Sequence, residues 1–168
     1  VADGLALWEK IMAAGKSQGI KACGYRAIES LRLEKGYRAW AGEINTETNP
    51  YEAGLGFAVS LKKDNFHGKA AAVAAQANLT RKLVAITFDD ITCVPFGSEP
   101  IRIGEKIVGR VKSGGQGYTI KKAIAYAYLP ITQSEVGTNV DVELFGTWRS
   151  GVICAEPLFD PTNERIKA

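Results

Sequence analysis

The sequence is poor in the residues that enzymes most often use for metal binding and nucleophilic catalysis. Its 168 residues include one histidine, His67, and three widely spaced cysteines without a CxxC pair, Cys23, Cys93 and Cys154. A zinc site is therefore not expected, because zinc needs several such ligands at close spacing. A Ser-His-Asp triad would have to use His67, and its setting, DNFHGKAA, supplies no partner. The cysteines are expected to be buried or half-buried free thiols in a reducing compartment.

The chain also lacks long apolar runs and a strong charge of either sign. The net charge is +3 with the charged residues scattered, which argues against a nucleic-acid partner or an anionic membrane. No apolar run approaches the roughly 20 residues needed to cross a bilayer. The opening VADGLALWEK does not have the pattern of a secretory signal. We therefore expect a globular protein with no nucleic-acid or membrane partner.

Two glycine-rich segments match phosphate-binding loops only in part. GLGFAV at 54–59 has two of the three glycines of the dinucleotide fingerprint, and SGGQGYT at 113–119 lacks the Lys-Ser/Thr pair of a P-loop. Both are predicted to be turns or bulges. AIAYAYL places Tyr126 and Tyr128 on one face of a strand, as base-stacking platforms do. Because such a face of a barrel strand is more commonly core, an oligonucleotide-binding barrel is not favoured.

The pattern of apolar residues divides the chain near residues 78–82. Residues 1–80 mix helical spacing with one strand-like alternation, GLGFAVSL, and are too irregular for a complete domain. In residues 81–168, short β-type runs are separated by Gly, Pro, Asn and Asp, which predicts a small antiparallel six-stranded barrel. The fold class is therefore α+β. The helices predicted in the first half are residues 4–14, residues 25–35 and an alanine-rich segment after Gly68.

The stretch LRLEKGYRAWAGE, residues 31–43, combines paired charges with two large aromatic residues. A glycine ends the predicted helix and releases Tyr37 and Trp40 into a loop, while Arg32 stays in the last helical turns. Flat rings beside an arginine suit a flat anionic ligand, because the rings stack and the guanidinium binds a carboxylate or phosphate. The alternative is that the rings pack in a joint between two domains and that Arg32 pairs with a nearby acid such as Glu29. Local sequence alone favours this packing interpretation, because large aromatic residues usually pack.

Several motifs run in the same order as in one folate-binding family. They are SLRLEKGYRAWAGEI, PYEAGLGFAVSLKK, FGSEPIRIGEKIVGRVKSGGQGYTIKKAIAYAYLP, GTNVDVELFG and EPLFDPTNERI. Together they resemble the C-terminal part of the aminomethyltransferase family, the T-protein of the glycine cleavage system. The first two favour the folate domains of dimethylglycine oxidase, dimethylglycine dehydrogenase and sarcosine dehydrogenase. The resemblance covers essentially the whole chain, with the end of a folate-binding domain at 1–80 and the family's C-terminal barrel at 81–168.

This resemblance implies a function in one-carbon transfer. In the family, a methyl-derived carbon produced by flavin oxidation passes to tetrahydrofolate, which is therefore the expected cofactor. Tyr37, Trp40 and Arg32 are the residues expected to contact it, although Ile28 stands where the T-protein pattern has a folate-contacting arginine. The family's catalytic aspartate and pterin-binding segment lie upstream of the matched residues, so no catalytic residue is predicted in this chain.

The same resemblance implies a location in the cytoplasm, or in the mitochondrial matrix in a eukaryote, and it implies partners. They are an FAD-binding domain or subunit, the upstream half of the folate domain, and the small molecule folate, with FAD held only by the missing domain or partner chain. The chain alone is expected to be inactive in amine oxidation. The alternative function is a non-catalytic β-barrel module for docking or interdomain packing.

Overall fold

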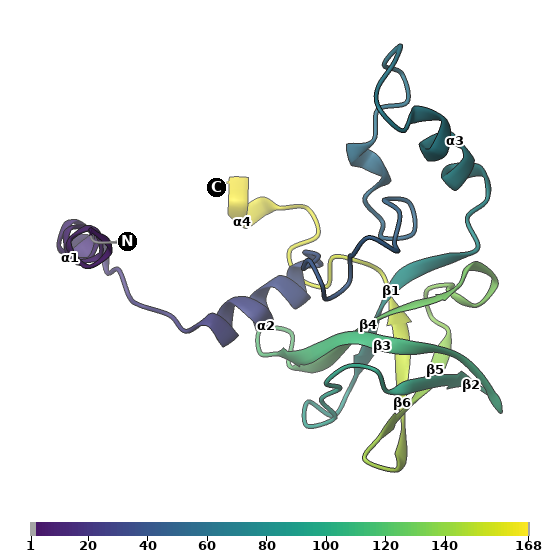
Figure 1. Cartoon of the computed structure of the whole chain (residues 1–168). Coiled ribbons are helices and arrows are strands. Elements are labelled where there is room, and N and C mark those ends of the chain that lie inside the picture. The colour runs from purple at the N-terminus through teal and green to yellow at the C-terminus, as the bar shows by residue number, and fades with distance from the viewer. Residues whose placement is uncertain (1–2, 168) are drawn as a thin grey trace.

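The computed structural model describes residues 3–167 and contains a closed antiparallel barrel of six strands (Figure 1). Around the barrel the strands follow the order β1-β4-β3-β2-β5-β6. Their bounds are Arg81–Phe88 for β1, Pro100–Ile103 for β2, Lys106–Gly117 for β3, Lys122–Pro130 for β4, Asn139–Leu144 for β5 and Thr147–Cys154 for β6. The predicted α+β fold with a six-stranded barrel is confirmed.

The helices of the first half form where the sequence predicts them, but its predicted strand does not. The helices are α1 (Gly4–Gly15), α2 (Tyr25–Lys35), α3 (Lys69–Ala77) and the C-terminal α4 (Glu164–Lys167), with 3₁₀ turns at Lys16–Gln18, Gly56–Ala58 and Ile131–Gln133. The segment GLGFAVSL is a 3₁₀ turn within a loop, so the strand prediction is wrong there. Gly54 has a φ of +73°, a left-handed conformation that interrupts an extended run.

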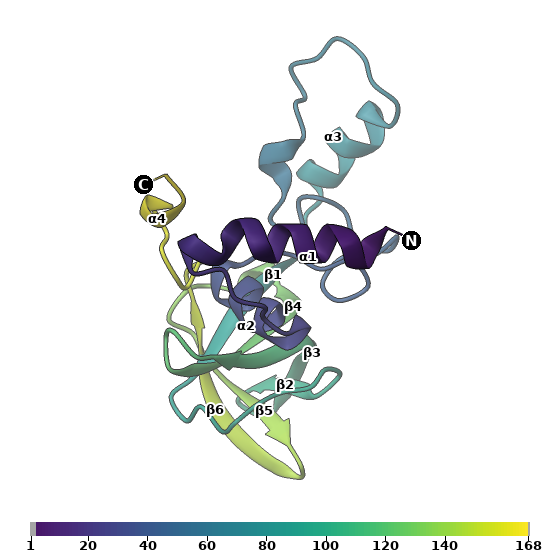
Figure 2. The same ribbon diagram turned by 90° about the vertical axis from the view of Figure 1, so that its left-hand side faces the viewer.

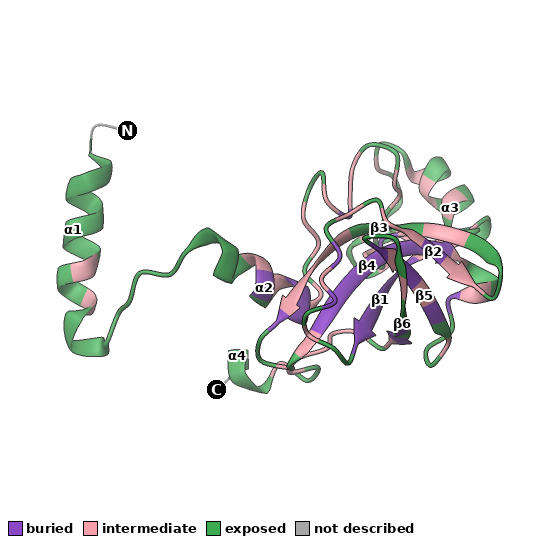
Figure 3. Cartoon of the chain, turned by 90° about the horizontal axis from the view of Figure 1, so that it is seen from below, coloured by how far each residue is buried: buried purple, intermediate pink, exposed green. Residues whose placement is uncertain are grey.

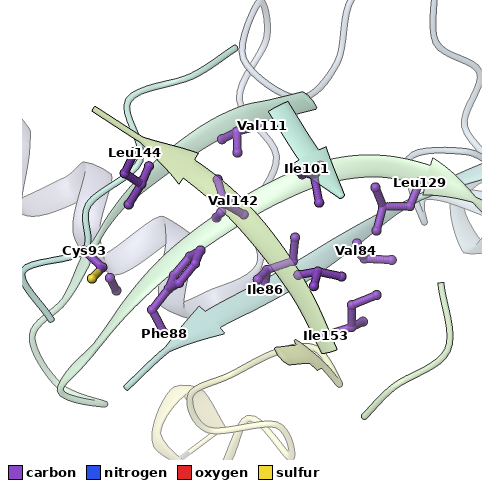
Figure 4. Close-up of a cluster of buried hydrophobic side chains, with 14 residues drawn as sticks. Val84, Ile86, Phe88, Cys93, Ile101, Val111, Leu129, Val142, Leu144 and Ile153 are labelled. Atoms are coloured by element: carbon purple, nitrogen blue, oxygen red, sulfur yellow. The ribbon is translucent and has the colours of Figure 1, made fainter. Parts of the chain in front are cut away.

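One cluster of side chains fills the inside of the barrel (Figure 4). Successive residues of a strand point to opposite faces, so alternate positions of each strand enter this interior. Strand β4 contributes three alanines there, which leaves room for larger side chains from facing strands. The cluster comprises Val84, Ile86, Phe88, Cys93, Ile101, Val111, Ala123, Ala125, Ala127, Leu129, Val140, Val142, Leu144 and Ile153.

Strand β6 needs a glycine for this packing. A Cβ at Gly151 would lie 2.9 Å from Cγ2 of Ile86 and 2.9 Å from Cε1 of Phe88. Distances this short do not occur between real side chains, so the ring of Phe88 and the methyl group of Ile86 occupy the space that a larger residue would take. Residue 151 of β6 is therefore a position in the barrel wall that only glycine fits.

The outer face of β1 and β4 is also buried, because the first half of the chain covers it. A second cluster contains Leu83, Ala85, Ile124, Tyr126 and Tyr128 from these strands, together with Leu33 from α2. The hydroxyl of Tyr126 donates a hydrogen bond to the carbonyl of Leu33 (3.0 Å), and that of Tyr128 donates to the carbonyl of Glu43 (2.9 Å). Both tyrosines are core residues, as the barrel interpretation predicts, and their hydroxyls bind α2 and the residues that follow it.

The C-terminal segment fixes the end of α2 from the other side. The amide of Phe159 donates to the carbonyl of Glu34 (3.0 Å), and Lys35 forms an ion pair with Asp160 (3.1 Å). The buried carboxylate of Glu34 also accepts a hydrogen bond from the amide of Thr119, at 2.7 Å, in the turn between β3 and β4. The barrel and the C-terminal segment therefore fix the C-terminal end of α2, from which the next loop begins.

Helix α1 stands away from the rest of the molecule (Figures 1 and 3), and in the view of Figure 2 it lies in front of α2 and the barrel. No residue of α1, all of which the structure describes, is buried, and Leu5, Trp8 and Ile11 are among its exposed apolar side chains. In the linker that follows, Cys23 is exposed, contrary to the prediction of a buried or half-buried thiol, because this segment packs against little else. No helix within residues 3–167 is both long and apolar enough to cross a membrane.

The uneven burial predicts uneven hydrogen exchange. We expect the amides of β1 and β4 to exchange most slowly, because both faces of these strands are buried, and those of α1 to exchange fastest. Exchange followed by mass spectrometry of peptides from the native chain measures this order. Stronger protection over residues 5–35 than over residues 83–155 would contradict the expectation.

Candidate functional site

The residues after α2 form a short loop, residues 37–43, that we call the aromatic loop. Gly36 ends α2 in a left-handed conformation (φ +72°), and its amide bonds back to the last turn of the helix. Tyr37 is 57% exposed and Trp40 is 69% exposed. Exposure of this size is uncommon for tryptophan, which usually buries most of its surface. The predicted ring residues therefore lie on the surface of this chain.

Arg32, the third predicted ligand contact, is largely buried, with its side chain 11% exposed. Its guanidinium forms ion pairs with Glu29 and with Glu43, the latter at 2.6 Å. It also donates to the carbonyl of Tyr37 (3.3 Å). Burial acts to lower the pKa of Arg32, but the hydrogen bonds to the two glutamates raise it above its ordinary value. The pairing with Glu29 is the contact that the alternative interpretation of the sequence describes.

Glu43 is the buried centre of this arrangement, and sequence reasoning did not assign it. Its side chain is fully buried and accepts hydrogen bonds from Arg32, from the hydroxyl of Ser113 in β3 and from the amide of Ala39 (2.7 Å). Burial acts to raise the pKa of Glu43, but these donors outweigh it and hold the pKa below its ordinary value. The carboxylate is therefore ionised at neutral pH, with both oxygens occupied.

A second arginine holds the start of the aromatic loop. Arg38 pairs with Glu156 (2.6 Å), donates to the carbonyl of Ala53 (3.1 Å) and lies over the ring of Tyr126, 5.2 Å from its centroid. Burial raises the pKa of Glu156, an effect that Arg38 opposes. Burial also raises the pKa of Tyr126, so its phenol stays protonated as a hydrogen-bond donor.

The arrangement is suited to binding and positioning rather than to proton transfer. Arg32 and Arg38 each face a carboxylate, and the carboxylate of Glu43 has three donors. The groups that remain open at this site are the two rings, which can stack on a flat ligand. Within residues 3–167, no group of three or more His, Cys, Asp or Glu side chains is placed to hold a metal ion.

A groove of about 830 Å³ runs between α2 and β3. Several of its polar side chains already have hydrogen-bond partners: Ser30 donates to the backbone carbonyl of Gln116 (2.5 Å), and Tyr118 donates to the side chain of Gln116 (2.5 Å). The rim includes Leu31 and Phe96, which are 57% and 75% exposed. Exposed apolar side chains that line a groove are typical of a surface that packs against another part of a protein.

Comparison with known proteins identifies two family models along the chain. Residues 1–63 match the model described as the GCVT N-terminal domain, and residues 81–160 match the glycine cleavage T-protein C-terminal barrel domain. Dimethylglycine dehydrogenase of human mitochondria is 44% identical over 98% of this chain, and the rat enzyme is 42% identical over the same share. An aminomethyltransferase of Symbiobacterium thermophilum is 39% identical over 97% of this chain. These matches confirm the resemblance inferred from the motifs.

A solved structure agrees with the sequence matches. The crystal structure of glycine cleavage system aminomethyltransferase T from Bartonella henselae has a TM-score of 0.84 and 27% identity, and covers 95% of this chain. The chain spans only part of these relatives: 20% of the human and rat dehydrogenases, 44% of the Symbiobacterium aminomethyltransferase and 45% of the Bartonella chain.

Proposed function

Because this chain belongs to the glycine cleavage T-protein family, we propose that it is the folate-binding, one-carbon-transfer part of a flavin-linked dimethylglycine or sarcosine oxidase or dehydrogenase. In this role it passes a methyl-derived carbon to tetrahydrofolate. The observation that carries the proposal is the aromatic loop, which presents two exposed rings on a backbone held by buried ion pairs. The high identity to dimethylglycine dehydrogenases over nearly the whole chain supports the flavin-linked branch.

We further propose a division of the chain at residue 80. Residues 1–80 are the end of the folate-binding domain, and residues 81–168 are the C-terminal barrel domain. The start of β1 at Arg81 and the two family-model ranges support this division. The first part covers the outer face of β1 and β4, so the barrel acts as the support on which the aromatic loop is mounted.

The three predicted contact residues have two different roles in this proposal. Tyr37 and Trp40 contact the folate directly, because their rings are open and flat ring systems stack well. Arg32 acts through the loop, because its donors already serve Glu29, Glu43 and the carbonyl of Tyr37. Direct contact by Tyr37 and Trp40 stays a prediction.

The chemistry of transfer divides between cofactor and protein. Tetrahydrofolate, when bound, supplies the ring nitrogen that accepts the carbon unit. The rings of Tyr37 and Trp40 orient the folate and exclude water from one of its faces, which favours a productive geometry. Glu43 does not move a proton, because both of its oxygens accept hydrogen bonds. The proton-transferring carboxylate is therefore proposed to come from the upstream half of the folate domain.

The proposed partners account for the uncovered apolar surface. Helix α1 exposes Leu5, Trp8 and Ile11, and the groove beside α2 has an apolar rim. We propose that the upstream half of the folate domain packs on these surfaces, and that an FAD-binding domain or subunit completes the protein. The small share of the dehydrogenases that this chain spans supports such additional parts.

Trp40→Ala tests the proposed site in the complete flavin-linked protein. We expect it to weaken tetrahydrofolate binding by roughly 1–3 kcal/mol, the effect of losing one stacking ring, and to leave flavin reduction by the amine unchanged. Calorimetric titration with tetrahydrofolate measures the affinity, and a thermal melt measures stability in parallel. Phe57→Ala is the matched control, since Phe57 is 87% exposed but lies outside the aromatic loop.

The same experiment separates the proposed function from interdomain packing. If the rings only seal a joint, Trp40→Ala lowers the melting temperature and leaves the folate affinity of the folded protein unchanged. In this chain alone, tetrahydrofolate binding is expected to be weak or absent, because the upstream wall of the pocket is missing. Tight binding by this chain alone would mean that the site is elsewhere.

A further inference from the structure

Glu43 joins three separate elements at one buried carboxylate. It accepts hydrogen bonds from Arg32 in α2, from the backbone of Ala39 in the aromatic loop and from Ser113 in β3. Its side chain has no exposed surface. A buried carboxylate is costly unless it is fully paired, so these contacts are expected to form together or not at all.

The backbone of Glu43 is held by the barrel as well. Its carbonyl accepts the hydroxyl of Tyr128 in β4 at 2.9 Å. The loop is closed at the same point by a bond from the amide of Ala41 to the carbonyl of Ile44 (2.8 Å), and Ala41 has a φ of +68°. A non-glycine residue in this conformation needs support from its surroundings. The side chain and the carbonyl of Glu43, bonded to β3 and β4, provide that support.

We propose that Glu43 is a positioning residue, which fixes the aromatic loop to strands β3 and β4 and thereby sets where the rings of Tyr37 and Trp40 lie. Loops at a surface are normally mobile, and ordered rings bind a ligand more tightly than mobile ones because less freedom is lost. Among the residues that the structure describes, Glu43 forms no hydrogen bond with the side chain of Tyr37 or Trp40, so it acts on the ligand through the loop. This inference rests on the proposed function only for the identity of the ligand.

The test measures the mobility of Trp40 directly. In a Trp8→Phe, Trp148→Phe background of this chain, Trp40 is the single tryptophan, and time-resolved fluorescence anisotropy reports its local motion. Glu43→Gln keeps the size of the side chain but removes the charge that pairs with the arginine. We expect the amplitude of fast local motion of Trp40 to rise roughly twofold. Glu52→Gln is the matched control, because Glu52 forms a comparable ion pair with an arginine (2.8 Å) away from the loop, and it should leave the anisotropy unchanged.

A second variant keeps the test decisive if Glu43→Gln does not fold. Ser113→Ala removes one neutral donor from the carboxylate and should produce a smaller rise in the motion of Trp40. A folded Glu43→Gln or Ser113→Ala protein with the anisotropy of the parent would overturn the positioning role. If Glu52→Gln increased the motion of Trp40 as much as Glu43→Gln does, the positioning role would also be overturned, because the effect would then be a general loosening of the fold.

The ligand is tested separately in the complete flavin-linked protein. There, Glu43→Gln should weaken tetrahydrofolate binding about tenfold, while flavin reduction by the amine stays unchanged. If the parent protein binds no tetrahydrofolate, the proposed function fails, and the anisotropy of Trp40 still decides the positioning role. If the parent binds and Glu43→Gln binds equally well, the positioning role fails and the proposed function stands.

Discussion

Phe88→Ala is expected to lower the free energy of unfolding by about 3–5 kcal/mol, the usual cost of deleting a buried phenyl ring. Phe88 is 1% exposed and lies in the barrel interior at the end of β1 (Figure 4). Its ring lies against Gly151 of β6. Because glycine has no side chain, residue 151 cannot fill the cavity that the lost ring leaves. Urea denaturation followed by circular dichroism measures the loss.

An exposed phenylalanine supplies the control for this prediction. Phe145, in the turn between β5 and β6, is 89% exposed, so Phe145→Ala should change the stability by no more than about 0.5 kcal/mol. A loss of less than about 1 kcal/mol for Phe88→Ala would mean that the barrel interior is loosely packed or that the barrel is not the cooperative unit.

The barrel was predictable because its strands carry their pattern locally. In β4, the run AIAYAYL alternates alanine with larger residues, and the alanines enter the interior while Tyr126 and Tyr128 face outward. Such alternation is set by the two-residue period of a strand and needs no knowledge of the partner strand. The turn chemistry is local too, since Gly104 at the β2–β3 turn has a φ of +59°.

The sequence of β4 also contains a signal that the outer face of the barrel is covered. Every residue of β4 from Ala123 to Leu129 is buried, although an antiparallel strand normally exposes one face. The nearly continuous apolar run therefore signals that something covers the outer face. What covers it, α2 and the aromatic loop, depends on contacts between residues more than 80 positions apart, such as Tyr128 with Glu43.

The missed strand at GLGFAVSL has the opposite cause. Its alternation is as regular as that of a true strand, but it has no neighbouring strand to bond, and Gly54 interrupts the extended conformation. A strand exists only through hydrogen bonds to another strand, which the local pattern does not contain. The helix prediction for α2 did not meet this difficulty, because helical hydrogen bonds are local.

The candidate site was predicted only in part, because only some of its signals are local in the sequence. The rings and Arg32 lie within nine residues of one another, and the break at Gly36 is a local signal. The partners that fix them are distant: Ser113 is 70 residues from Glu43, and Glu156 is 118 residues from Arg38. Sequence alone places an acid, Glu43, near the loop, but only the folded barrel brings Ser113 and Glu156 to the loop.

Arg32→Met is expected to cost about 3–5 kcal/mol at neutral pH, because it leaves the buried carboxylate of Glu43 without its cation. The apolar stem of the side chain is retained, so the loss of charge dominates. Replacing both residues, as Arg32→Met with Glu43→Leu, should recover part of this loss, since an apolar pair does not bury a lone charge. Glu29→Gln is the control. Its side chain is 41% exposed, so removing that ion pair should cost less than about 1 kcal/mol.

The cost of Arg32→Met should shrink as the solution becomes acidic. In the parent, the pKa of Glu43 lies below its ordinary value of 4.5, so the pair stabilises the fold above that value and loses this contribution as pH falls through the folded-state pKa. In Arg32→Met the guanidinium is gone, and burial favours the protonated acid, so acidification relieves the penalty instead. Urea denaturation of both proteins between pH 7 and about pH 3 should therefore give converging stabilities. A difference that stays constant over this range would mean that the loss comes from packing of the arginine stem and not from the charge on Glu43.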